Sequence, residues 1–300
     1  MISGQQRKVI AAGLFATLAA GLACTPASAQ QGNWQANYGV SLIGLPIGTA
    51  QVTAELDKSR YKIGVQARLT GLAGMVTGGK GAGSASGSFS EGRPVSAGYS
   101  ASGSNGKETR TVRMAVSGGN ATAVEISPPI IKKPDAVPVA DNHRRGITDP
   151  VTALLMPVPA GQNPISAAAC NRSIQIFDGN ARYDIALSFA GTRTVEGRGY
   201  NGPVVVCNAR YTPVSGHRNG RATQYMAANR DIEAWLAPIP ATSLVAPYRI
   251  SVRSEIGMVV IEATRFDGPV AAASVNGAAP HGGAITGSTA GRAQRSGSVN

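Results

Sequence analysis

The stretch RYKIGVQARL, residues 60–69, decides the fold, because apolar and polar side chains alternate along it. Tyr61 and Ile63 point to one side of an extended chain, whereas Lys62 and Gln66 point to the other. Successive side chains of a β-strand face opposite sides of a sheet. The alternation therefore predicts a strand with one buried face and one face in water.

Runs of the same kind recur along the chain and are separated by Gly, Asn, Asp and Pro, which are typical turn residues. They cover residues 34–44, 47–57, 108–118, 172–179, 181–191, 203–214, 231–239 and 248–266. Within the last run, SEIG predicts a hairpin turn. We therefore expect an all-β protein whose long curved antiparallel sheet forms an open or closed barrel or spiral, which would manage exposed sheet edges.

One short helix is predicted in TDPVTALLMPV, residues 148–158. Asp149 is a good N-cap, Pro150 suits the first helical position, and Pro157 ends the segment. The expected helix covers residues 150–156.

The strands fall into two halves of a single domain, residues 30–270. The halves, 34–126 and 170–268, are joined by a proline-rich extended linker, 127–146, and by the short helical segment 149–157.

The first 29 residues predict export. Arg7 and Lys8 precede an apolar run of about 15 residues, and ASA at 27–29 is a small-residue cleavage motif before Gln30. The run is shorter than the ~20 residues of a membrane span. We expect a cleaved signal peptide, a periplasmic location and no transmembrane span after cleavage.

Two further expectations concern the termini. Cys24 leaves open the alternative of a lipoprotein anchored through that cysteine. Residues 271–300 are rich in Gly, Ala and Ser without periodicity, which predicts a disordered tail.

The chain is basic, with 28 Lys and Arg against 16 Asp and Glu. Its charges are scattered, and aromatic residues make up only 5% of the chain, so little is available to stack bases. We therefore expect no nucleic-acid partner. Attraction to anionic envelope surfaces, such as lipid headgroups or acidic glycans, is the functional alternative.

After signal cleavage two cysteines remain, Cys170 and Cys207. An even pair in an exported protein predicts one disulfide. A metal site lacks ligands, because the three histidines are far apart in sequence. No metal or cofactor is expected.

The octet FDGNARYD, residues 177–184, is either a catalytic site with paired carboxylates or a hairpin turn. Asp178 and Gly179 lie between two strand-like runs, which predicts a structural hairpin turn. Arg182 and Asp184 would then share a face as an exposed ion pair of little energetic weight, ~0.2–1 kcal/mol. Paired carboxylates for acid–base chemistry are the alternative.

The segment RYTPVSGHRNGRA, residues 210–222, is the densest cationic stretch of the second half. It is either a solvated hairpin loop or a site for an anionic group. The candidate contacts are Arg210, His217, Arg218 and Arg221.

A glycine-rich stretch, GMVTGGKG at 74–81, imitates a phosphate-binding loop, but Gly81 stands where that motif needs Ser or Thr. No helical pattern follows it. Its glycines predict a mobile loop or a close backbone approach at a sheet corner.

Several of these elements, in this order, resemble the bacterial exported family known as domain of unknown function 3108. They are YGVSLIGLPIGTAQVTAEL, DPVTALL, C…FDGNARYDIAL, VVCNARYTPVSGH and YRISVRSEIGMVVIEATRF, and the likeness covers residues 34–268. The resemblance implies a periplasmic, largely antiparallel β protein of the open barrel or spiral kind. It implies no established activity and no catalytic residues.

Two functions remain as hypotheses. The first is a non-enzymatic protein that supports cell-envelope integrity by binding a lipid, a glycan or a protein partner. The alternative is an envelope-directed hydrolase that uses His217 or the carboxylates of Asp178 and Asp184.

Overall fold

The computed structural model describes residues 32–71, 74, 78–131, 133–197 and 199–267. The predicted signal peptide, Cys24 and the predicted tail lie outside the described residues, so these remain predictions.

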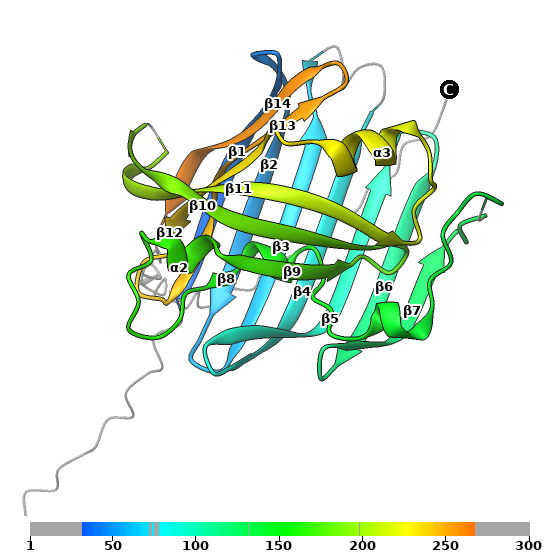
Figure 1. The fold of residues 1–300 in the computed structure, drawn as a ribbon, viewed down its shortest axis with the longest axis horizontal. Coiled ribbons are helices and arrows are strands. Elements are labelled where there is room, and N and C mark those ends of the chain that lie inside the picture. Colours follow the sequence, from blue (N-terminus) through cyan, green and yellow to red (C-terminus); the bar gives the residue numbers. More distant parts are fainter. Residues whose placement is uncertain (1–31, 72–73, 75–77, 132, 198, 268–300) are drawn as a thin grey trace, which may run out of the picture.

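The described chain forms one antiparallel sheet of fourteen strands (Figure 1). The first half contributes β1 Gly32–Leu42, β2 Leu45–Leu56, β3 Arg60–Leu69, β4 Lys80–Ser90, β5 Arg93–Ser104, β6 Thr109–Ser117 and β7 Asn120–Ser127. The second half contributes β8 Met156–Pro157, β9 Arg172–Phe177, β10 Arg182–Glu196, β11 Asn201–Ser215, β12 Ile232–Pro238, β13 Leu244–Ser254 and β14 Gly257–Asp267. Two short α-helices, α2 Ala167–Cys170 and α3 Arg221–Ala228, and two 3-10 turns, η1 Asp141–Arg144 and η2 Thr152–Leu154, complete the fold.

The strand order is β7-β6-β5-β4-β3-β2-β1-β14-β13-β12-β11-β10-β9, with β8 pairing to β13. Each half is therefore a meander, and pairing of β1 with β14 joins the halves. Figure 1 shows β2–β7 as one layer, while β9, β10 and β11 cross in front of it. The all-β prediction is confirmed.

The alternation read in the sequence is borne out in β3. Tyr61 and Ile63 are each only 2% exposed, whereas Lys62 is exposed. The same holds in β6, where Met114 and Val116 are buried.

The sheet does not close, because its two edge strands, β7 and β9, do not pair with each other. Residues 147–158, which we call the connecting segment, begin between these two edges. The amide of Ile147 donates to the carbonyl of Gly119 in the β6–β7 turn, and the amide of Thr148 donates to the carbonyl of Gln175 in β9. Thr148 also forms a parallel bridge with Ile176. The segment thus replaces the missing strand pairing over a short distance.

The next residues of this segment fill the space between the halves. Asp149 and Thr152 are completely buried, and Leu155 is nearly so. The Asp149 carboxylate accepts hydrogen bonds from the amides of Val151 and Thr152, at 3.0 and 2.8 Å. Asp149 therefore caps a turn here as expected of an N-cap residue.

The helix at this place is shorter than predicted. A single 3-10 turn, η2, replaces the expected α-helix over 150–156. The reason is that the following residues are drawn into extended structure: Met156 pairs with Val245 in β13, and the amide of Val158 donates to the carbonyl of Ser243.

The glycine-rich stretch 74–81 is described only in part, since residues 75–77 lie outside the described residues. Its last two residues, Lys80 and Gly81, begin the regular strand β4. The expected close backbone approach is present at Gly74, where a Cβ would lie 2.6 Å from the carbonyl oxygen of Leu69. Further along β4, a Cβ on Gly83 would lie 2.9 Å from Cγ2 of Val151, so glycine makes room for the connecting segment.

Two hydrophobic clusters stabilise this arrangement. The first joins buried residues of β1–β6 to Ile147, Val151 and Leu155 of the connecting segment. The second contains Met156 and Val158 with buried residues of α2 and β10–β13. The connecting segment therefore contributes to both clusters.

Candidate functional site

The predicted disulfide is present. Cys170 in α2 and Cys207 in β11 are bonded, and both are completely buried. The bond ties α2 to β11, in the middle of the second meander, so its role is structural.

The octet forms the β9–β10 hairpin. The Asp178 carboxylate accepts from the amides of Asn180 and Ala181, at 2.8 and 2.7 Å, and Gly179 has a φ of +95°. The carboxylate of Asp178 is thus engaged in the turn, as the structural interpretation predicted.

The Arg182–Asp184 ion pair exists at 2.9 Å, but it is not an exposed pair. The Arg182 side chain is only 8% exposed. Its guanidinium also donates to the carbonyls of His143 and Arg145, at 3.5 and 3.4 Å. Arg182 therefore attaches the linker to β10, a contact that spacing along one strand could not reveal.

The four candidate anion contacts do not share one free cationic surface. Arg210 donates to the carbonyl of Asn229 at 3.1 Å, Arg218 donates to both carboxylate oxygens of Asp135, and Arg221 pairs with Glu255 at 2.9 Å.

The fourth, His217, lies in the loop after β11. Its carbonyl accepts from the amide of Val137 in the linker, and its Nδ1 is buried without a hydrogen-bond partner. The segment 210–222 therefore serves largely to hold the linker and α3.

The described part of the chain carries neither a metal-binding cluster nor a membrane-spanning helix. It contains no group of three or more His, Cys, Asp or Glu side chains arranged to hold a metal ion. Within the same residues no helix is long and apolar enough to cross a membrane.

A hollow of about 1210 Å³ runs along the exposed side of β1–β7. Small side chains line its middle, among them Gly64, Ser84, Ser86 and Ser100.

One end of the molecule carries an unusual set of exposed aliphatic side chains. The described chain has six large hydrophobic residues that are exposed, and four of them lie at this end. These four, which we call the aliphatic rim, are Ile43 (67% exposed), Leu45 (70%), Leu69 (38%) and Ile256 (70%). The β2–β3 and β4–β5 turns, at the opposite ends of their strands, contain none of the six.

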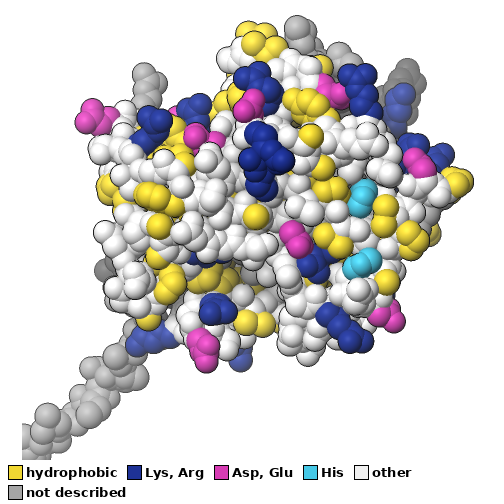
Figure 2. Space-filling model, viewed as in Figure 1, with side chains coloured by type: hydrophobic (Ala, Val, Ile, Leu, Met, Phe, Trp, Pro, Cys, Tyr) yellow, Lys and Arg dark blue, Asp and Glu magenta, His cyan; other side chains and the backbone are white. Residues whose placement is uncertain are grey.

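The pairing of β1 with β14 brings two tips of the rim together. Ile43, in the β1–β2 turn, donates its amide to the carbonyl of Met258 at 2.9 Å and lies against Gly257. Ile256 occupies the β13–β14 turn, next to Gly257. Both turns lie at the top of Figure 1, and Figure 2 shows hydrophobic side chains there beside Lys and Arg.

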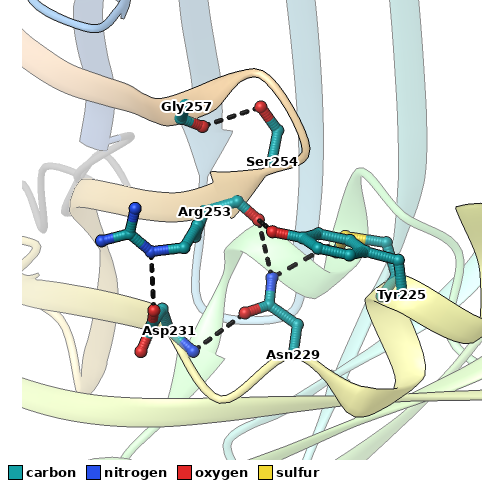
Figure 3. A network of polar contacts seen from close by, with 7 residues as sticks. Tyr225, Asn229, Asp231, Arg253, Ser254 and Gly257 are labelled. Atoms are coloured by element: carbon teal, nitrogen blue, oxygen red, sulfur yellow. Dashed lines mark hydrogen bonds and ion pairs between the residues drawn. The ribbon is translucent and has the colours of Figure 1, made fainter.

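A polar network holds α3 against the β13–β14 hairpin (Figure 3). The carbonyl of Arg253 accepts from Asn229 Nδ2 at 2.9 Å and from the Tyr225 hydroxyl at 3.3 Å. The Arg253 guanidinium pairs with Asp231 at 2.7 Å. Hydrogen bonds and one ion pair to the segment 225–231 therefore fix the position of the β13–β14 hairpin.

The rim end is basic. The β1–β2, β3–β4, β5–β6 and β13–β14 turns with the two nearest residues of their strands, as far as they are described, and the segment 221–233 hold seven cations: Arg68, Lys80, Lys107, Arg110, Arg221, Arg230 and Arg253. The same residues include four carboxylates: Glu108, Asp231, Glu233 and Glu255. Three of the cations pair with these acids at 2.7–2.9 Å.

A hollow of about 570 Å³ opens beside Leu69, and Val40, Lys80 and Arg110 also line it. Aliphatic side chains thus protrude from a surface with excess positive charge. Such a combination is typical of proteins that lie on anionic lipid.

Sequence reasoning missed the rim because its members are single aliphatic residues in separate turns. The available signal was an isoleucine at a hairpin tip in SEIG and two aliphatic residues around Gly44 in LIGL, where turns usually hold polar residues.

The fold defines the class: an antiparallel β protein whose barrel-like sheet stays open between β7 and β9. The chain belongs to the family described as "Protein of unknown function (DUF3108)", whose model matches residues 33–264.

Among solved structures, the chain is similar to the "Beta-barrel-like Protein of Domain of Unknown Function DUF1849 from Brucella abortus". The identity is 10% and the TM-score 0.43, over 79% of this chain and 98% of that chain. A comparison with curated protein sequences found no match.

Proposed function

We propose that this chain is an exported, non-enzymatic protein of the cell envelope that docks on anionic lipid and in this way supports envelope integrity. Export to the periplasm is supported by the N-terminal signal pattern and by a disulfide of the kind that oxidising compartments maintain. The observation that carries lipid docking is the aliphatic rim with its surrounding cations.

Exposed aliphatic side chains at hairpin tips favour lipid over a glycan or a protein partner. Leu45 and Ile256 are each 70% exposed at hairpin tips, so they can enter the interfacial region of a bilayer without unfolding the sheet. Cations near the surface of an anionic membrane add about 1 kcal/mol each. Arg68, Lys80, Lys107 and Arg230 have no carboxylate partner within 4 Å among the described residues.

Vesicle cosedimentation tests the docking. The purified protein should bind vesicles that contain phosphatidylglycerol, and added salt should weaken the binding because the attraction is partly electrostatic. The double variant Leu45→Asp/Ile256→Asp should lower the partition coefficient at least about tenfold, since burying one such side chain contributes about 1.5–3 kcal/mol.

Ile131→Asp is the matched control, because Ile131 is 87% exposed but lies in the linker. It should bind as the unchanged protein does. Equal losses in the control and the double variant, or undiminished binding by the double variant, would overturn the assignment.

Export is tested separately. Cell fractionation should place the protein in the periplasm, and N-terminal sequencing should read from Gln30. A cytoplasmic protein that retains its first residues would contradict export.

A further inference from the structure

A third hollow, of about 650 Å³, lies between the connecting segment, α2, β9 and the β4–β5 turn. The β4–β5 turn is at the end of the strands opposite the aliphatic rim. Two arginines from distant parts of the chain line it, Arg93 at the start of β5 and Arg172 at the start of β9. We call this hollow the arginine pocket. Figure 2 shows hydrophobic side chains gathered in the lower part of the face, with basic side chains beside them.

Arg172 is incompletely satisfied. Its Nη2 donates to the carbonyl of Ala168 in α2 at 2.8 Å, but its Nε is buried without a hydrogen-bond partner. A buried donor without an acceptor costs free energy and calls for an explanation. None of the ion pairs in the described part of the chain includes Arg93 or Arg172.

The two guanidinium groups also affect each other. Burial lowers the pKa of the Arg172 guanidinium, and the positive charge of Arg93 lowers it further. Like charges that face one hollow repel, and an anion placed between them would relieve both the repulsion and the unpaired donor.

The rest of the lining is mixed. Polar groups come from Thr148, Asn171, Ser173 and Gln175. Apolar surface comes from Pro157, Pro159, Ala160, Ala168 and Ile174. Concave sites of several hundred Å³ with apolar walls and a few convergent polar groups are typical of small-molecule binding.

We infer that the arginine pocket binds a small amphiphilic anion, a carboxylate with an aliphatic body, whose head lies between Arg93 and Arg172. The aliphatic body lies along the side chains of the connecting segment. This site is independent of the proposed lipid docking, because it uses none of the rim residues.

Glu91 also lines the pocket, from the exposed β4–β5 turn, and makes no ion pair in the described chain. Its carboxylate repels an anion, so removing its charge should change the affinity for an anion in the direction opposite to removing an arginine. Glu91→Gln should tighten binding, whereas loss of either arginine should weaken it.

Calorimetric titration with sodium octanoate tests the inference. Octanoate should bind, whereas acetate should bind at least tenfold more weakly because it lacks the aliphatic body. Octan-1-ol should also bind at least tenfold more weakly, since it lacks the charge. Inorganic phosphate should resemble acetate.

Arg172→Gln should weaken octanoate binding at least tenfold, and Arg93→Gln about threefold or more. Arg93 is exposed, so its variant keeps the fold intact even where Arg172→Gln disturbs the Ala168 contact. Arg113→Gln, an exposed arginine in β6, is the matched control and should leave binding unchanged.

Equal binding of octanol and octanoate, or equal effects of Arg93→Gln and Arg113→Gln, would overturn the inference, as would no binding of octanoate. Vesicle binding by the Arg93 variant should stay normal, which separates this outcome from a failure of lipid docking.

Discussion

The hydroxyl oxygens of Tyr61 in β3 and Thr152 in the connecting segment lie 2.9 Å apart, with both residues almost completely buried. They are separated by 91 positions in sequence. This hydrogen bond fastens the connecting segment to β3 in the first meander.

Removing the hydroxyl of Thr152 should therefore destabilise the protein. Thr152→Val keeps the shape but leaves the buried Tyr61 hydroxyl without its partner, which should lower the free energy of unfolding by about 1–3 kcal/mol. Urea denaturation measures the change. Thr53→Val, on the exposed side of β2, is the control and should stay within about 0.5 kcal/mol. Equal midpoints for both variants would contradict the role of this hydrogen bond.

Two glycines on neighbouring strands test how the connecting segment packs. Gly83→Ala would place a Cβ 2.9 Å from Val151, so we expect a loss of about 1–3 kcal/mol and a lower melting temperature. Gly103→Ala meets nothing within 4 Å and should be neutral or slightly stabilising. If calorimetry ranked the two variants in the opposite order, the connecting segment would not pack against β4 as described.

The disulfide should stabilise the native state mainly by restricting the unfolded chain. Replacing both Cys170 and Cys207 by alanine should cost about 2–5 kcal/mol in urea denaturation. Because both sulfurs are completely buried, a thiol-alkylating reagent should label the reduced protein only after unfolding. Reductant should lower the urea midpoint of the unchanged protein and leave that of the double variant where it is. A reductant-insensitive midpoint in the unchanged protein would count against the bond.

Alkaline pH should unfold the protein by ionising buried phenols. Burial raises the pKa of Tyr61 to about 12, and burial also raises the pKa values of Tyr38, Tyr99 and Tyr183. Each phenol holds its proton more tightly in the folded state than in the unfolded chain. Its contribution to stability is therefore complete below about pH 10 and is lost as the pH rises through the folded pKa.

Urea denaturation from about pH 9 to pH 12 measures this loss, and tyrosinate absorbance follows the ionisation. Tyr61→Phe should show a shallower decline of unfolding free energy with pH, although its stability at neutral pH is lower. An equal slope in variant and parent would mean that Tyr61 ionises in the folded protein as easily as in the unfolded chain.

Much of the fold was predictable because its signals are local. The alternation around Tyr61 and Ile63 predicts β3, and Asp178 with Gly179 predicts the β9–β10 turn. The pairing of Cys170 with Cys207 followed from there being two cysteines after signal cleavage. Each of these conclusions needs only neighbouring residues or a count.

Other elements carry no local signal. The inward positions of β4 hold three glycines, Gly81, Gly83 and Gly87, so only Ala85 and Phe89 place apolar side chains on that face and the alternation is weak. These glycines are explained by close neighbours from elsewhere, Val151 against Gly83 and the Tyr61 side chain against Gly87. The helix α3 was likewise missed, since it is held by contacts to β13 and lacks a strong apolar face.

By itself, the sequence determined the strand class, the positions of several turns and the disulfide, because side-chain periodicity and turn chemistry act over a few residues. Only the tertiary structure decided that the sheet stays open, that residues 147–158 fill and join its halves, and that Arg182 is buried. Pairing of β1 with β14 assembles the aliphatic rim, and the path of the connecting segment assembles the arginine pocket. The rim and the pocket both depend on contacts between residues far apart in the chain. Such contacts form only when the whole chain buries its apolar side chains and pairs its backbone hydrogen bonds at the same time.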